Sequence, residues 1–391
     1  MLLRRGSLAP TPFVPLTREM LRIGVPREVK TDENRVAVTP DGVREVVAAG
    51  IDIVIETGAG AGSSITDDEY RAAGASIAPA DEVWERSDLI CKVKEPQGDE
   101  LDRLRPGLVL FTYLHLAAYP KVADALLDRG VTGVGYETVQ VADGSLPLLA
   151  PMSEVAGRMS VQIGANLLER HNGGRGVLLG GVPGVRPARV VVLGAGNVGW
   201  NAAWLAAGIE AEVHLLDKNL DRLRFVDQIH RGRITTLASN RGAVERAVAE
   251  ADLVIGAVLV AGGRAPTIVT DEMVRQMKPR AAIVDIAIDQ GGCIETSHET
   301  THHDPTYEVH GVLHYAVGNI PGAVPNTSTH ALTNATLPYL VELARLGPAA
   351  AAVADPALAC GFNTHGGVVT NDAVAEAIGR PFTPLGQALA S

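Results

Sequence analysis

The sequence predicts an α/β protein of two doubly wound domains with a cleft between them, the first domain being discontinuous. Three observations predict this fold class. Short β-branched runs alternate with helical patterns along nearly all of the 391 residues, which is typical of parallel sheets covered by helices on both faces. A long amphipathic segment begins near Met152 and separates two such regions. A leucine stripe in residues 331–345 indicates a late helix that returns to the first domain.

The first α/β region has recognisable helix boundaries. Thr39 followed by Pro40 places an N-cap before a first-turn proline, and Gly50 ends the same helix. Thr66 and Glu69 have the spacing of a capping box. The strands predicted around these helices are Leu21–Val25, Ile51–Glu56, Leu89–Val93, Leu108–Leu114 and Val131–Tyr136.

The second region follows the amphipathic segment, whose apolar residues recur at steps of three or four residues from Met152 to Leu167. A loop rich in glycine and proline closes that helix. The strands predicted after it are Arg189–Leu193, Glu212–Leu216, Leu253–Val258, Ala281–Ile286 and His314–Val317. We therefore expect one domain of residues 20–147 and 326–391, and a second of residues 148–325. Residues 1–19 are interpreted as a disordered leader.

Composition excludes several classes of protein. The net charge of −11 argues against a nucleic-acid partner, because phosphate binding needs a surplus of Lys and Arg. No apolar run approaches the ~20 residues of a membrane span, and the first residues lack the apolar stretch of a signal peptide. Cys91, Cys293 and Cys360 stand at unrelated spacings, which fits a reducing cytosol. We expect a cytoplasmic protein without a membrane partner.

A glycine-rich turn predicts a dinucleotide site in the second domain. The strand 189–193 runs directly into Gly194, Gly196 and Gly199, which have the GxGxxG spacing of a Rossmann turn, and a helix follows. Such glycines make the tight turn, admit a pyrophosphate and let the helix pack against the strand. Asp217 ends the next strand at the distance expected of a ribose ligand, which favours NAD over NADP. Arg222 either lies over the adenine or is a solvated charge.

Three candidate substrate ligands follow strands of the first domain. Arg35 lies in the loop after the first strand, Lys94 at the end of another strand and His115 at the end of a third. An arginine can hold a carboxylate with two parallel hydrogen bonds, and a histidine is the usual acid or base. Taken alone, each of these three residues is equally explained as a structural or surface residue. Because the carboxyl ends of parallel strands meet at one edge, a joint substrate site is favoured.

Asp289 is the candidate carboxylate of the second domain. It follows the strand 281–286 in a glycine-rich segment, so we expect it beside the nicotinamide. There it would activate the attacking water or orient His115, unless it only caps a turn. The nearby histidines of residues 298–303 resemble a metal-ligand run, but they lack clean i,i+4 spacing on a helix. We expect no metal.

Nine stretches of the chain resemble one family, that of the alanine dehydrogenases and nicotinamide nucleotide transhydrogenases. The similarity runs from about Met20 almost to the C-terminus and looks like alanine dehydrogenase proper. The stretches are GVPREVKTDENRVAVTP, KVKEP, LHLAA, LLAPMSEVAG, GGRGVLLGGVPGV, VVLGAGNVG, DLVIGAVLV, VDIAIDQGGC and ALTNATLPY.

The resemblance implies a reaction and a set of roles. A hydride would pass from C2 of L-alanine to NAD, and the imine would be hydrolysed to pyruvate and ammonium; the reverse is reductive amination. Arg35 and Lys94 would hold the substrate carboxylate and carbonyl, and His115 and Asp289 would act as acid and base. Homohexamers are also implied. The implied cofactor-binding residues, beyond the three glycines, are Ser153, Asn197, Val198, Asp217, Arg222, Ser239, Val258, Leu259, Ile286, Ala287, Ile288, Asp289, Val317, Gly318, Asn319 and Ile320.

Departures from the family and competing functions stay open. Close relatives often carry an arginine in the cofactor loop where this chain has His298. Some members bind magnesium through a Glu and a His one helical turn apart, but Glu342 is followed here by Leu346 at the partner position. The rival functions are an NAD(H)-binding module of a proton-translocating transhydrogenase and a nucleotide-binding protein without catalysis. Activity on glycine or serine is also left open.

Overall fold

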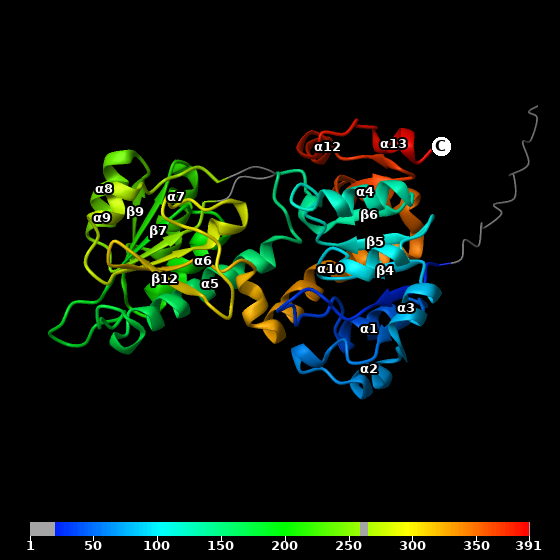
Figure 1. The fold of residues 1–391 in the computed structure, drawn as a ribbon, viewed down its shortest axis with the longest axis horizontal. Helices are drawn as coiled ribbons and strands as arrows, with labels where there is room; N and C mark the ends of the chain where they lie inside the picture. The colour runs from blue at the N-terminus through cyan, green and yellow to red at the C-terminus, as the bar shows by residue number, and fades with distance from the viewer. Residues whose placement is uncertain (1–19, 259–264, 391) are drawn as a thin grey trace, which may run out of the picture.

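The protein contains two α/β units, each built on its own sheet. A computed structural model describes residues 20–258 and 265–390. The predicted leader, 1–19, and Leu259 lie outside these residues. Figure 1 shows the two sheets side by side, with two long helices, α5 (Ala150–Leu167) and α10 (Pro325–Ala354), between them.

The first sheet has eight strands among the described residues, in the order β15-β14-β6-β5-β4-β1-β2-β3. Strands β1 to β6 run parallel, whereas β14 and β15 pair antiparallel at one edge. The strands are β1 (Ile23–Val25), β2 (Ile53–Glu56), β3 (Ser76–Ala78), β4 (Leu89–Cys91), β5 (Val109–Thr112), β6 (Thr132–Gly135), β14 (Phe362–His365) and β15 (Val368–Val369). The helices are α1 (Pro40–Ala48), α2 (Asp67–Ala73), α3 (Ala80–Arg86), α4 (Pro120–Asp128), α11 (Pro356–Cys360), α12 (Asp372–Ile378) and α13 (Leu385–Ala388).

Local signals place these helices where the sequence predicts them. The Thr39 hydroxyl accepts a hydrogen bond from the Gly42 amide at the start of α1. The capping box of Thr66 and Glu69 is present at the start of α2. Both caps satisfy amide groups that the first turn of a helix leaves unpaired.

The second sheet has seven strands in the described part of the chain, in the order β12-β13-β11-β10-β7-β8-β9. All pairs are parallel except β12 with β13. The strands are β7 (Arg189–Leu193), β8 (Glu212–Asp217), β9 (Ile234–Ala238), β10 (Leu253–Gly256), β11 (Ala282–Asp285), β12 (Thr306–Val309) and β13 (Val312–Tyr315). The helices are α6 (Asn197–Gly208), α7 (Leu220–His230), α8 (Arg241–Ala249) and α9 (Asp271–Arg275).

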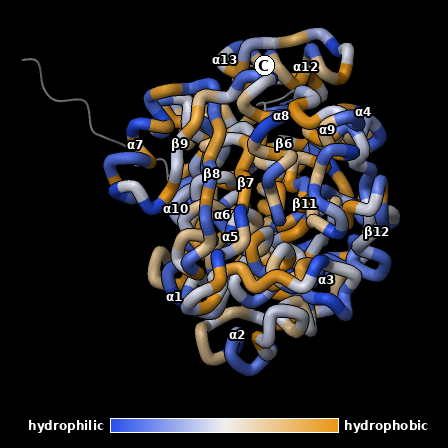
Figure 2. The backbone as a smooth tube through the Cα atoms, turned by 90° about the vertical axis from the view of Figure 1, so that its left-hand side faces the viewer, coloured by the Kyte–Doolittle hydropathy of each residue, from blue (hydrophilic) through white to orange (hydrophobic). Residues whose placement is uncertain are grey.

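Helix α5 contributes to the cores of both units. Met152 and Val155 pack into the core of the first sheet, and Val161 and Leu167 into that of the second. In Figure 2 the apolar residues run through the interior along strands such as β7 and β11, and polar residues colour outer elements such as α2. The amphipathic helix that separates the two regions of the sequence therefore contributes side chains to both cores.

The predicted fold class is confirmed, including the discontinuity, because β14 and β15 return to the first sheet after the whole second unit. The predictions missed the edge strands β3, β9, β12 and β15, and also β14, which lies between β6 and β15. The edge strands are only partly buried, and the buried β14 has the sequence FNTH, which lacks the β-branched run of a central strand. The strand predicted at His314–Val317 begins two residues earlier, and the helix predicted at 331–345 extends over Pro325–Ala354 with a break at Gly347, whose φ is +70°.

Candidate active site

The glycine-rich turn has the geometry of a dinucleotide-binding loop. Gly194 follows β7 with φ of +103°, a conformation that side chains other than glycine rarely adopt. A Cβ on Gly199 would lie 1.8 Å from the Gly194 carbonyl oxygen, so only glycine allows α6 to start this close to β7. Gly196 has open space where its Cβ would be, apart from the Arg222 guanidinium at 3.8 Å. The free amides at the start of α6 thus stand beside an open approach for a phosphate.

Asp217 connects this turn to the end of β8. Its carboxylate accepts hydrogen bonds from the amides of Ala195, at 2.6 Å, and Asn219, at 2.7 Å. The Ser239 amide donates to the Asp217 carbonyl at 2.9 Å. The residues expected around an adenosine therefore meet at one sheet edge, and Arg222 adds a cation there. A carboxylate beside a glycine-rich turn fits a dinucleotide site.

Most of the remaining predicted cofactor residues lie in segments that follow strands of the second sheet. Val258 follows β10, and its amide lies 3.3 Å from the position of a Cβ on Gly194. Residues 286–289 form a short helix after β11, residues 317–320 follow β13, and Ser153 lies on α5. The Asn319 amide donates to the Asp289 carboxylate at 3.3 Å, so the two runs adjoin. Parallel strand order therefore collects segments separated by more than a hundred residues.

A buried carboxylate that sequence reasoning missed organises this loop. Asp285, at the end of β11, accepts hydrogen bonds from the amides of Ala287, Cys293 and Ile294. Burial raises the pKa of Asp285, although the hydrogen bonds from Cys293 and Ile294 lower it. The sequence signal that could have identified Asp285 is its place at the end of an apolar strand. The prediction chose Asp289, which is exposed one turn further on.

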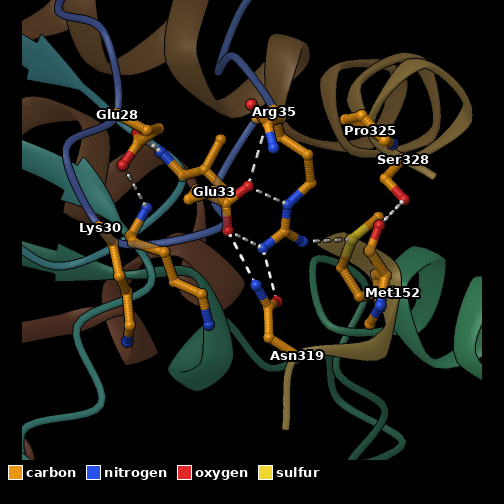
Figure 3. A network of polar contacts seen from close by, with 12 residues as sticks. Glu28, Lys30, Glu33, Arg35, Met152, Asn319, Pro325 and Ser328 are labelled. Atoms are coloured by element: carbon orange, nitrogen blue, oxygen red, sulfur yellow. Dashed lines mark hydrogen bonds and ion pairs between the residues drawn. The ribbon is translucent and has the colours of Figure 1, made fainter. Parts of the chain in front are cut away.

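The two units meet through Arg35 and Asn319, as Figure 3 shows. Arg35 donates to the Asn319 side-chain oxygen at 2.8 Å, and the Asn319 amide group donates to Glu33 at 3.1 Å. The Arg35 guanidinium also donates to the Glu33 carboxylate and contacts the Met152 sulfur at 3.0 Å. Burial alone would raise the pKa of Glu33, but Arg35 holds it at about 2. Glu33 is therefore ionised and links the guanidinium to the amide.

Lys94, Lys30 and Arg35 form one cationic group around the imidazole of His115. Burial, Arg35 and Lys30 lower the pKa of Lys94. Burial, Lys94, Lys30 and Arg35 lower the pKa of His115 to about 3. These electrostatic effects indicate that the three residues predicted after separate strands lie near one another. The Lys94 ammonium, which has no ion pair among the described residues, suits an anionic substrate, because a partly buried cation without a partner attracts a carboxylate.

The His115 backbone is held in an unusual conformation. Its φ is +45°, and its amide donates to the Glu137 carboxylate at 2.6 Å. The neighbouring Leu114 amide donates to the same carboxylate. Burial raises the pKa of Glu137. Strain held by surrounding bonds is a common feature of functional sites. Sequence reasoning missed Glu137, which carries no local motif.

The histidines near residue 300 are used in other contacts. His302 lies 3.4 Å from the Asn319 carbonyl oxygen, and His303 lies 3.3 Å from the Asp32 carboxylate of the first unit. His298 stacks on the Tyr307 ring. In the described ranges, 20–258 and 265–390, no three side chains of ligating type form a group that could hold a metal ion.

Comparison with known proteins gives the family. Models of the alanine dehydrogenase/PNT family match residues 24–156, as the N-terminal domain, and 160–372, as the C-terminal domain. The chain belongs to this family. It is 56% identical to the alanine dehydrogenase of Methanococcus maripaludis, covering 94% of this chain and 99% of the relative. It is 55% identical to that of Mycobacterium tuberculosis H37Rv, covering 95% and 100%.

Solved structures agree with this family assignment. An L-alanine dehydrogenase superposes with a TM-score of 0.89 at 50% identity, covering 92% of this chain and 99% of that one. A transhydrogenase from Sinorhizobium meliloti reaches a TM-score of 0.77 at 25% identity, covering 89% and 99%. The family and the glycine-rich turn together imply an oxidoreductase with a nicotinamide nucleotide cofactor.

Proposed function

We propose that this chain catalyses the NAD-dependent oxidative deamination of L-alanine to pyruvate and ammonium, and the reverse reductive amination. The relatives named alanine dehydrogenase, at 52–56% identity over nearly the whole chain, support this reaction. The observation that carries the proposal is the bond between Arg35 and Asn319. It joins the cationic group of one unit to a segment of the other unit whose predicted role is cofactor binding.

The proposed roles follow from the chemistry of each side chain. Arg35 and Lys94 bind the carboxylate and the carbonyl group of the substrate. His115 and Asp289 exchange protons with the amine and with the water that hydrolyses the imine. The bound nucleotide supplies the hydride acceptor. In this structure Asp289 contacts Asn319, and among the described residues no hydrogen bond or ion pair joins it to His115.

NAD is the proposed nucleotide because of Asp217. Its carboxylate stands at the end of β8 beside the glycine-rich turn, where it accepts hydrogen bonds from ribose hydroxyls and repels a 2′-phosphate. Leu259 belongs to the proposed cofactor site but lies outside the described residues. Apart from Ser153 on α5, the other proposed cofactor residues lie in segments that follow strands of the second sheet.

The proposal extends to assembly and location. We propose a cytoplasmic homohexamer, with a substrate domain of residues 20–147 and 326–391 and a cofactor domain of residues 148–325. Exposed Trp204, Phe225 and Ile229, on α6 and α7, support self-association, because apolar groups gathered on a surface commonly mark contacts between chains. No described helix has the length and apolar character needed to cross a membrane.

A direct assay tests this function. The purified chain is mixed with NAD and L-alanine at alkaline pH, and NADH absorbance is followed; parallel reactions contain glycine, L-serine, D-alanine or NADP. We expect turnover with L-alanine and NAD, and at least tenfold less with the other substrates and with NADP. Tight NADH binding without turnover of any amino acid would contradict the proposal and favour a transhydrogenase-type module.

A further inference from the structure

Two buried polar atoms face one another in the cationic group without a hydrogen bond. The Oε2 atom of Glu95 and the Nδ1 atom of His115 lie 3.9 Å apart. Within the described part of the chain neither atom has a hydrogen-bond partner. Buried polar groups are nearly always paired, so two opposed unpaired atoms need an explanation. Catalytic hydrogen bonds are often long in the absence of ligand and shorten when substrate binds.

Glu95 is held so that one oxygen is left for the histidine. Its Oε1 atom accepts hydrogen bonds from Lys30 Nζ, at 2.7 Å, and from Gln97 Nε2, at 2.6 Å. Lys30 also donates to the Tyr119 hydroxyl at 2.9 Å. The Glu95 side chain has no exposed surface. With Oε1 fixed by two donors, the free Oε2 is directed at the imidazole.

The imidazole is held from the other side. The His115 amide is bound by Glu137, and the ring packs against Tyr113 with 5.6 Å between centroids. Nδ1 is buried, although 37% of the His115 side chain is exposed. The exposed part of the ring therefore lies away from Nδ1, on the edge that carries Nε2. One nitrogen faces the carboxylate, and the other is available to a substrate.

We propose that Glu95 is a positioning residue that sets the tautomer of His115 for the deamination proposed above, on which this inference rests. Nδ1–H donates to Glu95, so Nε2 keeps its lone pair for the substrate. In alanine oxidation Nε2 takes the proton that the amine or the attacking water gives up. In reductive amination the proton returns from Nε2 by the same route.

The charges around the ring show why a carboxylate is needed there. Lys94, Lys30 and Arg35 all oppose protonation of the imidazole. Glu95 is the carboxylate that faces its Nδ1 atom, whereas Glu137 binds the backbone and Tyr113 is a neutral neighbour. The imidazolium formed during turnover would otherwise stand among three cations. A carboxylate at Nδ1 offsets their charge at the step that needs it.

The Glu95→Gln variant tests the tautomer directly. Lys30 and Gln97 donate to Oε1 and so keep the amide oxygen on their side, which turns the new NH₂ group toward Nδ1. That donor makes Nδ1 the acceptor and puts the proton on Nε2. We expect kcat for L-alanine to fall about 10²-fold, with KM within about threefold and NADH affinity unchanged. The acid limb of the kcat profile should move down by about one pH unit, because a counter-charge of the imidazolium is lost.

Two further variants separate positioning from a structural role. Glu95→Asp keeps the charge but withdraws it by one methylene, so we expect kcat about tenfold below wild type with the acid limb in place. Glu100→Gln removes a carboxylate of the same loop that pairs with Lys92 and does not face His115. It should lower the thermal midpoint but leave kcat within about threefold and the acid limb unmoved.

The outcomes distinguish this inference from the proposed function. A wild-type chain that does not oxidise L-alanine defeats the proposed function. An active wild type with kcat of Glu95→Gln within threefold, or with its acid limb unmoved, overturns the inference. Equal losses in all three variants, in step with lost NADH binding, would show a structural role and also overturn it. If Glu95→Gln does not fold, a wild-type kcat in Glu95→Asp overturns it.

Discussion

The two lysines that follow β4, Lys92 and Lys94, lie in different electrostatic environments. Lys92 is fully buried and forms ion pairs with Glu28, at 3.3 Å, and Glu100, at 2.7 Å. Burial alone would lower the pKa of Lys92, but the two carboxylates raise it. Lys94, two residues later, has no carboxylate within ion-pair distance among the described residues. Burial and the neighbouring cations Arg35 and Lys30 lower its pKa.

The difference shows where this fold holds a positive charge that a substrate can bind. In the Lys92 region, the ammonium forms ion pairs with two carboxylates, one of which, Glu28, also binds the amide of Val93. In the Lys94 region, Arg35 pairs with Glu33 and Lys30 with Glu95, but the half-buried Lys94 ammonium has no ion pair among the described residues, which is unfavourable until an anion arrives. A lysine without an ion pair is therefore the physical mark of the proposed substrate site, and a paired lysine is the mark of its scaffold.

The largest expected effect comes from exchanging each lysine for methionine. Lys94→Met removes an ammonium that the fold disfavours, so stability should stay equal or rise, while kcat/KM for L-alanine falls about 10³-fold, or about 4 kcal/mol. Lys92→Met leaves two buried carboxylates without their cation and should cost about 3 kcal/mol of stability. Thermal unfolding and steady-state kinetics measure both. The comparison fails if Lys94→Met destabilises as much as Lys92→Met and still turns over L-alanine.

The glutamates of the two regions should respond to acid in opposite ways. The pKa of Glu33 is held at about 2 by Arg35, below its ordinary 4.5. Its contribution to stability, about 3 kcal/mol, is present above pH 4.5 and is lost as the pH falls toward 2. Burial raises the pKa of Glu28 although Lys92 lowers it, so Glu28 adds no slope below pH 4.5.

Urea unfolding between pH 4.5 and 2.5, at one protein concentration, measures this difference. Wild type should lose stability steeply over that range, Glu33→Gln should lose much less, and Glu28→Gln should keep the wild-type slope. A wild-type slope in Glu33→Gln would mean that Arg35 does not hold Glu33 ionised. Fixed concentration matters because the stability of an oligomer depends on it.

The contrast between the two regions also shows how far the sequence could predict the site. Arg35, Lys94 and His115 were predictable because each follows a central strand whose apolar run marks it. Glu33, Glu95 and Glu137 were not, because a loop carboxylate looks like a solvated charge until its partners are known. The Glu137–His115 bond spans 22 residues, and the Arg35–Asn319 bond spans 284.

One interior strand of the first sheet escaped prediction for a related reason. Strand β14 pairs with β6 more than two hundred residues earlier in the chain, and this pairing defines it more than its own composition does. The glycine-rich turn needed no such information. Its three glycines, strand and helix are contiguous, and the backbone itself makes the site.

Substitutions in that turn change the backbone geometry of the site without changing its charge. They give the smallest expected effect of the changes considered. Gly196→Ala places a methyl group in open space beside Arg222. Because nothing is displaced, the thermal midpoint of the variant should lie within about 2 °C of wild type. The methyl occupies the approach of the pyrophosphate, so the Kd for NADH should rise about 10- to 100-fold, or about 1.4–2.7 kcal/mol. Fluorescence titration measures it.

Gly199→Ala is the matched variant, because its methyl would meet the Gly194 carbonyl oxygen at 1.8 Å instead of open space. It should lose stability as well as NADH affinity, since the helix must move away from β7. In both variants the pH dependence of any remaining turnover should equal that of wild type, because neither change touches the cationic group. A shifted pH profile in Gly196→Ala would show that the two halves of the site are coupled through Asn319 more tightly than the bonds of Arg35 and Glu33 imply.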